Sequence, residues 1–264
     1  MHQQIKSKLL ENKKLNRRCK ALVHSGFADC NDIKQGRLME IKPVARIHTD
    51  FPEKFGIPRQ SNLVKEARGT IVFEPEFSQP ECVRGIEGYD YLWLVWGFDH
   101  GEKNTWSPTV RPPILGGNKR MGVFATRSPF RPNPLGLSSV RLESVETTET
   151  GPVLHVLGAD LRDGTEIYDI KPYVPTSDCH PNVRGGIATE NEWHSVRVEI
   201  PDDLQCFFDT NQLETLKEVL ALDPRPATHH DPQRTYAMAF ADWDVHFTVD
   251  DQEGVLTVTN LTRR

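Results

Sequence analysis

Gly-Val-Phe-Ala-Thr-Arg-Ser-Pro-Phe-Arg-Pro-Asn-Pro-Leu-Gly-Leu-Ser-Ser-Val-Arg-Leu, residues 122–142, contains three prolines between positions 129 and 134. Proline stops a helix, is excluded from a central strand and forces the residue before it into an extended conformation. Strand-like runs flank the prolines, at 121–125 and 137–142. We therefore expect a stiff loop between two strands, a common arrangement for binding a ligand.

Three polar side chains are fixed on this loop, those of Arg127, Arg131 and Asn133. The window 103–142 holds seven Lys or Arg residues and no Asp or Glu, whereas the rest of the chain has 25 basic residues (32 less these seven) and 37 acidic ones. A positive region in a negative protein predicts binding of a polyanion or an anionic substrate. Two other interpretations stay open: a proline-rich surface turn, or arginines that pair with carboxylates from elsewhere in the fold.

The composition indicates a soluble globular protein. With 264 residues, 37% of them hydrophobic, the chain is long enough for a substantial core. It has no apolar run of the roughly 20 residues that span a bilayer, and its first residues lack the apolar segment of a secretory signal. Its five cysteines form no Cys-x-x-Cys pair, and its ten histidines show no metal-ligand spacing. We predict a cytoplasmic protein without a metal site or a membrane segment.

From residue 41 to about residue 174 the sequence predicts short strands separated by proline and glycine turns. The strand-like runs are 41–48, 69–74, 91–98, 122–125, 138–142 and 152–161. Six or more such runs favour a barrel or a sandwich. The apolar run 91–98 is expected to be buried on both sides, with its two tryptophans in the core.

Four regions are expected along the chain: a basic N-terminal extension (1–40), a β domain (41–175), a linker (176–187) and a smaller α+β domain (188–264). The extension is a loosely docked helix, an arm that contacts nucleic acid or a solvated appendage. All three stay open, because the segment has many charges and only an imperfect helical pattern.

The C-terminal region starts with a strand-like run at 195–200, continues with a helix at 211–222, and closes with a hairpin of 245–249 and 255–259. Residues 201–264 carry twelve acidic and five basic side chains, so this domain as a whole should repel nucleic acid. Any contact is expected from a local patch made of Arg225, His229, His230 and Arg234.

Further polar motifs complete a candidate site. They are Pro58-Arg59-Gln60, Asp99-His100 at the end of the run 91–98, the tight turn Asp163-Gly164, and Asp169, Lys171 and Tyr173 beyond that turn. The chain lacks the glycine-rich dinucleotide fingerprint, the P-loop lysine motif and the Gly-x-Ser-x-Gly elbow. Its pattern therefore indicates none of the enzyme classes that use those motifs.

In their order along the chain these segments resemble the TsaA/TrmO family. The likeness covers 41–174 and rests on Pro58-Arg-Gln, on Ala125-Thr-Arg-Ser-Pro-Phe-Arg-Pro-Asn-Pro-Leu-Gly-Leu-Ser, and on Asp163-Gly-Thr…Asp169-Ile-Lys-Pro-Tyr. The C-terminal region is similar to that of the family's bacterial members through Asp223-Pro-Arg-Pro-Ala and Tyr236…Val245-His-Phe. The first forty residues carry no part of the likeness.

The resemblance implies a mainly β protein, with a TsaA-like β-barrel domain followed by a smaller α+β C-terminal domain. It implies a methyltransferase that uses S-adenosyl-L-methionine, bound near a homodimer interface. The implied substrate is N6 of threonylcarbamoyl-adenosine at position 37, in the anticodon loop of threonine tRNA. Two other functions stay open: a cofactor-binding regulatory module without catalysis, and methylation of a small carboxylated substrate.

By the same resemblance the cofactor contacts are Pro58, Arg59, Gln60, Asp99, His100, Arg127, Leu137, Asp163, Gly164, Thr165 and Glu166, the last at a position where the family often has proline. The predicted substrate-binding residues are Arg131, Asn133, Lys171, Tyr173, Arg111, Lys119 and Arg120. Candidates for a general base are Asp99, His100, Asp169 and Tyr173, and loss of the proton to water after transfer is the alternative. Whether Arg127 and Arg131 hold the carboxylate of the cofactor, that of the substrate or tRNA phosphates stays open.

Overall fold

The structure, a computed structural model, describes residues 40–98, 106–112, 115, 119–190, 195–226, 229 and 231–264. Asp99, His100, His230 and the N-terminal extension up to residue 39 lie outside these residues, so the predictions about them stay predictions. Within the described ranges, no helix is both long and apolar enough to cross a membrane.

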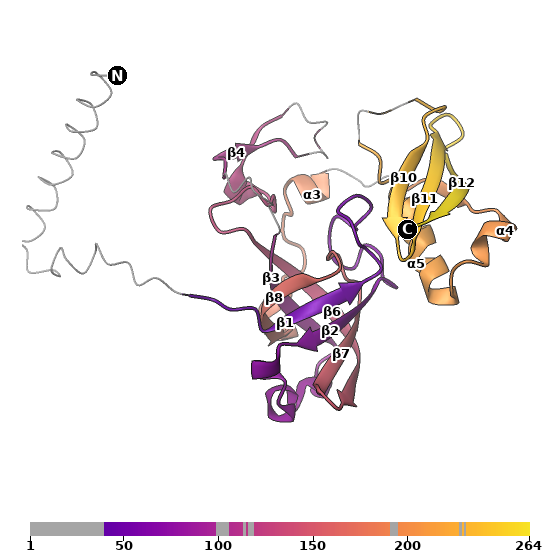
Figure 1. Cartoon of the computed structure of the whole chain (residues 1–264). Coiled ribbons are helices and arrows are strands. Elements are labelled where there is room, and N and C mark those ends of the chain that lie inside the picture. Colours follow the sequence, from indigo (N-terminus) through magenta and orange to yellow (C-terminus); the bar gives the residue numbers. More distant parts are fainter. Residues whose placement is uncertain are drawn as a thin grey trace, which may run out of the picture. The chain divides into compact units, whose positions relative to one another are not determined.

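Six antiparallel strands close into a barrel (Figure 1). They follow one another around it in the order β1, β2, β7, β6, β3, β8. Their bounds are β1 Ala45–Thr49, β2 Arg68–Phe73, β3 Tyr91–Gly97, β6 Leu135–Thr148, β7 Gly151–Leu157 and β8 Thr165–Pro172. The prediction of a mainly β protein, with a barrel followed by a smaller domain, is confirmed.

Apolar side chains fill the interior of the barrel. Every strand contributes at least one fully buried residue, among them Ile47, Ile71, Leu94, Val140, Leu154 and Ile167. Barrels of this size have an interior just wide enough for their own side chains. A ligand of this domain therefore binds at a rim or on the outer face.

The prediction that the run 91–98 is buried on both sides is wrong. Leu92 and Leu94 are fully buried, whereas on the outward face Tyr91 is exposed and Trp93 is half-buried. The reason is the barrel itself, because successive side chains of a strand point alternately into the interior and outward. Trp96 follows a register shift after Val95; it is half-buried and packs against the barrel core, as predicted.

The strand expected at 122–125 is also wrong. β5 is only Met121–Gly122, paired with β4 (Thr109–Val110), and Val123–Ala125 forms a 3-10 helix, η5. The remaining short elements of this domain are the 3-10 helices η1 Pro75–Phe77, η2 Pro80–Val83 and η3 Ile86–Gly88. Two helical turns, α2 (Pro175–Asp178) and α3 (Ile187–Glu190), follow the barrel.

The C-terminal part is a four-stranded sheet in the order β10, β11, β12, β9, accompanied by two helices. Its elements are β9 Arg197–Glu199, α4 Asp202–Gln205, α5 Thr210–Ala221, β10 Tyr236–Phe240, β11 Trp243–Asp250 and β12 Val255–Arg263. Asp209 and Gln212 form a capping box at the start of α5, which satisfies two of its free amide groups. The predicted helix at 211–222 and the closing hairpin are both present.

One connection of the barrel domain belongs to the core of the C-terminal sheet. Phe51, Val64 and Ala67, from the segment between β1 and β2, are buried together with residues of α5, β10, β11 and β12. The Asp50 carbonyl accepts a hydrogen bond from the Ala241 amide at 2.8 Å, and the Thr215 hydroxyl donates to the Glu66 carbonyl at 3.0 Å. The C-terminal domain therefore holds both ends of the segment that carries Pro58-Arg59-Gln60.

We expect Phe51→Ala to lower the free energy of unfolding by about 3–5 kcal/mol, because it removes a ring that is 1% exposed and packs edge-on against Phe240 at 5.8 Å. Urea denaturation followed by circular dichroism measures this loss. The matched control is Tyr89→Ala, at a ring that is 41% exposed, which should cost well under half as much. Equal losses for the two variants would contradict the shared core.

Candidate functional site at one rim of the barrel

One rim of the barrel collects most of the predicted site residues. We call it the site rim: the end where β1, β3 and β7 finish and β2, β6 and β8 begin, as the pairs Ile47 with Thr165 and Gly97 with Leu135 show. Three connections meet there: the segment 50–67, the described part of the β3–β6 insertion, and the turn 158–164.

Two of the predicted motifs contact each other directly at this rim. The Arg127 guanidinium donates a hydrogen bond from Nη1 to Oε1 of Gln60 at 2.6 Å. Pro58 is buried, so its rigid ring anchors the segment that presents Gln60. Arg127 itself is exposed, and its partner is a neutral amide, so its positive charge remains available to an anionic group.

Sequence reasoning missed a buried polar network next to Arg127. The Trp96 indole donates to the Ser138 hydroxyl at 3.0 Å, and that hydroxyl donates to Oδ1 of Asp160 at 2.6 Å. Burial raises the pKa of Asp160 to about 6, while Ser138 and the positive charge of Arg127 act in the opposite direction. The sequence signal was a single carboxyl between the apolar neighbours Ala159 and Leu161, both fully buried.

Arg131 stabilises its own loop. Its Nη1 donates to the carbonyl oxygens of Thr126 at 3.1 Å and Ser128 at 3.3 Å. Because Pro129 already restricts the chain between these residues, the loop has few alternative conformations. Asn133 is exposed, and its carbonyl accepts from the Leu135 amide at 2.8 Å where β6 begins. The roles of Arg131 and Asn133 in substrate binding stay predictions.

The predicted turn at 163–166 is bonded to β1. Gly164 has φ +74°, a left-handed conformation that favours glycine, and Asp163 accepts from the Thr49 amide at 3.1 Å and pairs with His48 at 3.1 Å. Glu166 forms an ion pair with Arg46 at 2.7 Å. This ion pair links β1 to β8 across the start of the barrel's last pairing.

The second group of predicted residues lies on the outer face of the barrel. Leu137 and Asp169 flank Val95 in one row across β6, β3 and β8. Further along β8, Lys171 pairs with Asp169 at 2.8 Å, which raises the pKa of Lys171. From Thr165 to Lys171 the strand extends roughly 20 Å. The structure therefore does not bring Lys171 together with Arg127.

Tyr173 follows β8, beyond Lys171. Its ring contacts Tyr91 at 6.2 Å and Trp93 at 5.7 Å between centroids. Burial raises the pKa of Tyr173, so at neutral pH its hydroxyl stays protonated and is a poor proton acceptor. Among the candidate bases in the described residues, Asp169 is engaged by Lys171 and Tyr173 is protonated.

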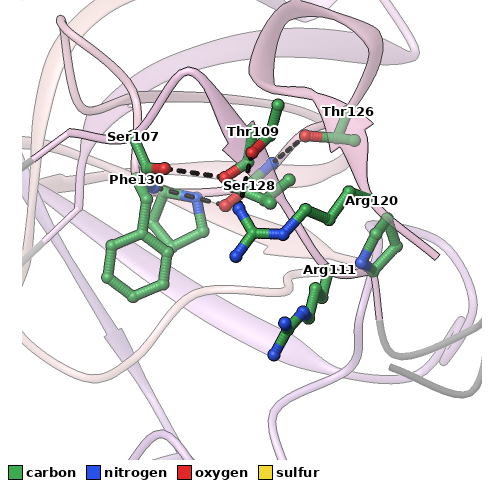
Figure 2. A pocket seen from close by; sticks show the side chains of 10 residues that line it. Ser107, Thr109, Arg111, Arg120, Thr126, Ser128 and Phe130 are labelled. Carbon is green, nitrogen blue, oxygen red and sulfur yellow. Dashed lines mark hydrogen bonds between the residues drawn. The ribbon is translucent and has the colours of Figure 1, made fainter. Parts of the chain in front are cut away.

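The three basic residues predicted in the insertion are all exposed. Arg111, Lys119 and Arg120 lie next to the short β4–β5 pair, and Nη1 of Arg120 donates to the Thr109 hydroxyl at 2.9 Å. A cavity of about 500 Å³ adjoins them, lined by residues that include Ser107, Arg111, Arg120 and Phe130 (Figure 2).

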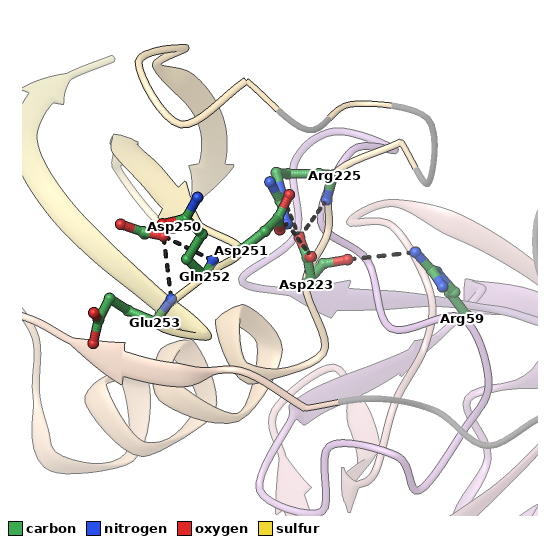
Figure 3. A network of polar contacts seen from close by, with 7 residues as sticks. All are labelled: Arg59, Asp223, Arg225, Asp250, Asp251, Gln252 and Glu253. Atoms are coloured by element: carbon green, nitrogen blue, oxygen red, sulfur yellow. Dashed lines mark hydrogen bonds and ion pairs between the residues drawn. The ribbon is translucent and has the colours of Figure 1, made fainter.

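The predicted nucleic-acid patch of the C-terminal domain needs a correction at Arg225. Its side chain is only 5% exposed and is held by both oxygens of Asp223, at 2.9 and 2.8 Å, and by Asp251 at 2.6 Å (Figure 3). The prediction took this arginine as a surface charge, but two carboxylates compensate it in the interior. The loop that carries Asp223 and Arg225 also contacts the segment 50–67, because the Arg59 guanidinium donates to the Asp223 carbonyl at 3.4 Å.

Within the described residues, no group of three or more His, Cys, Asp or Glu side chains is arranged to hold a metal ion. The described cysteines, Cys82, Cys179 and Cys206, are free and exposed thiols.

We expect Asp160 to make stability depend on pH. Because its folded pKa of about 6 lies above the unfolded value of about 3.9, the protein is most stable with respect to this group below pH 4. It loses about 3 kcal/mol in total as the pH rises from 4 through the folded pKa of about 6. Asp160→Asn should remove this slope. Urea denaturation of both proteins between pH 4 and 7 measures the difference, and parallel curves would contradict the raised pKa.

The family models that match the chain correspond to its two structural parts. The model of the tRNA-methyltransferase O N-terminal domain matches residues 46–179, and that of the TrmO C-terminal domain matches residues 194–264. The chain is 38% identical over 225 residues to a tRNA (adenine(37)-N6)-methyltransferase of Escherichia coli K12, which covers 80% of this chain and 94% of that protein. A protein of that name from Eikenella corrodens is 46% identical over 165 residues, 61% of this chain and 92% of its own. A crystal structure of TrmO from Pseudomonas aeruginosa superposes with a TM-score of 0.68 at 32% identity, covering 85% of this chain and 99% of that one. The chain belongs to the tRNA-methyltransferase O family.

Proposed function

We propose that this protein transfers the methyl group of S-adenosyl-L-methionine to N6 of threonylcarbamoyl-adenosine at position 37 of threonine tRNA. Membership of the family makes it an S-adenosylmethionine-dependent tRNA (adenine-N6)-methyltransferase. The observation that supports the more specific reaction is the contact of Arg127 with Gln60 beside a basic insertion. A substrate with both a carboxylate and a phosphate backbone matches that concentration of positive charge.

The chemical groups at the site rim fit the cofactor. Arg127, charged and exposed, suits the carboxylate of its amino-acid part, and Asp160 and Asp163 suit hydroxyl or ammonium groups. Leu137, which is 50% exposed beside this rim, offers apolar surface to an adenine ring. When bound, the cofactor supplies a methyl group already activated by its sulfonium.

In this proposal the protein accelerates transfer mainly by alignment. The loop braced by Arg131 and the segment anchored by the C-terminal domain hold Arg127 and Gln60 in fixed positions. Arg127 or Arg131 receives the threonyl carboxylate, and the exposed Arg111, Lys119 and Arg120 bind phosphates of the RNA. The proton of N6 leaves to Asp99, His100 or Asp169, or to water after transfer.

We propose that two copies pair through the outer face of β6, β3 and β8. This face exposes large apolar side chains: Leu135 at 36%, Leu137 at 50%, Tyr91 at 37% and, just beyond β8, Val174 at 38%. Large apolar side chains exposed on one face are typical of an interface. Pairing there would place Leu137 of each copy, and the cofactor next to it, at the contact between subunits.

Leu137→Asp should convert the dimer into a monomer, because it buries a charge at the centre of the proposed interface. Light scattering after gel filtration measures the mass. The control is Val183→Asp, at a side chain that is 65% exposed and off this face, which should leave the mass unchanged. A wild-type monomer, or a dimer that tolerates the charge, would contradict the proposed interface.

The central experiment is transfer of labelled methyl from S-adenosylmethionine to two matched threonine tRNAs, with and without the threonylcarbamoyl group. We expect label only on the modified tRNA. Arg127→Ala should weaken cofactor binding or transfer tenfold or more, since a charge-assisted hydrogen bond contributes about 1.5–3 kcal/mol. Arg84→Ala, an exposed arginine that pairs with Glu81, serves as the control.

The other outcomes identify the alternatives. Cofactor binding without transfer to either tRNA would indicate a regulatory module. Transfer to a small carboxylated molecule, independent of salt and of Arg111, Lys119 and Arg120, would indicate a small substrate. Full activity of Arg127→Ala would contradict the assignment of the site while leaving the reaction intact.

A further inference from the structure

The described part of the β3–β6 insertion holds three exposed aromatic rings. Phe124 is 78% exposed, Trp106 56% and Phe130 52%, and Phe124 is the most exposed large apolar side chain in the described part of the chain. Large apolar side chains gathered on a surface usually mark a binding site. None of these rings is among the residues predicted to bind the cofactor or to act as a base.

Hydrogen bonds join the two segments that carry the rings. The Val123 amide, next to Phe124, donates to the Pro108 carbonyl at 3.0 Å. The Ser107 amide, next to Trp106, donates to the Phe130 carbonyl at 3.2 Å. Together with the β4–β5 pair these bonds hold the two segments that carry the rings side by side.

Guanidinium groups lie beside one of these rings. Phe130, Arg111 and Arg120 all line the cavity of about 500 Å³ (Figure 2). Arg127, which bonds Gln60 at the site rim, lies on the loop between Phe124 and Phe130. The insertion thus combines exposed flat apolar rings with positive charge, beside the proposed methylation site.

We propose that Trp106, Phe124 and Phe130 form a stacking surface for unpaired bases of an RNA loop, with Arg111 and Arg120 holding its backbone at the cavity. This inference rests on the proposed tRNA substrate and deepens it. Sequence-tolerant binding of single-stranded RNA combines aromatic stacking with positive charge. Holding the neighbouring bases would help to keep the target N6 aligned with the methyl donor.

A second copy of the chain is a less suitable occupant of this surface. The window 103–142 has seven basic and no acidic residues, so two such surfaces in contact would repel each other. The outer face of β6, β3 and β8 offers apolar contacts beyond this insertion. RNA supplies flat bases that can stack on the rings and negative charge that can pair with the arginines.

The test is the affinity of the full-length protein for threonine tRNA over a series of salt concentrations. Phe124→Ala and Trp106→Ala should each raise the Kd about tenfold, in the range of one lost stacking contact, and Phe124→Trp should restore it. Both alanine variants should keep the wild-type dependence of log Kd on log salt, whereas Arg120→Ala should reduce this slope by about one. Tyr89→Ala, an exposed ring at the other end of β3, is the matched control.

The outcomes separate this proposal from the proposed function. If wild-type protein methylates the tRNA and the alanine variants bind within twofold of wild type, the stacking surface is wrong. If the alanine variants change the mass in gel filtration together with the Kd, the rings serve contact between copies, which also overturns it. If Phe124 and Trp106 determine RNA affinity but no methyl is transferred, the stacking surface stands and the proposed reaction fails.

Discussion

A closed barrel packed with its own side chains has no interior left for a ligand. The predicted site residues therefore lie at a rim, in the connections between strands or on the outer face. Ile47, Leu94 and Ile167 meet inside, so the polar groups of the same strands are confined to the rims and the outer face. Ser138 shows the limit of this rule: it points inward, and it is tolerated because Trp96 and Asp160 satisfy its hydroxyl. The chemistry consequently depends on connections between strands rather than on the strands.

Those connections need support, and the C-terminal domain supplies part of it. Phe51 is buried in the core of that domain, and Arg59 reaches the carbonyl of Asp223. Asp223 is in turn held by Arg225, whose charge is compensated by two carboxylates. The C-terminal domain thus has a mechanical role, because it holds the segment that carries Gln60.

Local patterns in the sequence predicted local structure well. The prolines after Arg127 predicted an irregular loop before β6, and the helical spacing of leucines predicted α5. Partners distant in sequence were not predictable, because nothing near Arg127 indicates that its hydrogen-bond acceptor is Gln60, 67 positions earlier. Asp160 was missed for the same reason, and Arg225 was misjudged because its second carboxylate, Asp251, follows 26 positions later.

The closure of the barrel also has a consequence for how the chain folds. β1 pairs with β8, so the first strand finds its second neighbour only after Ile167 has been made, more than 100 residues after Ala45. The residues of β10 and β11 that pack around Phe51 are synthesised later still. Contacts so far apart in sequence make folding slow, and an unpaired β1 or β3 edge is open to other chains meanwhile. A ribosome-bound fragment that stops before β8 would therefore be the most aggregation-prone form of this protein.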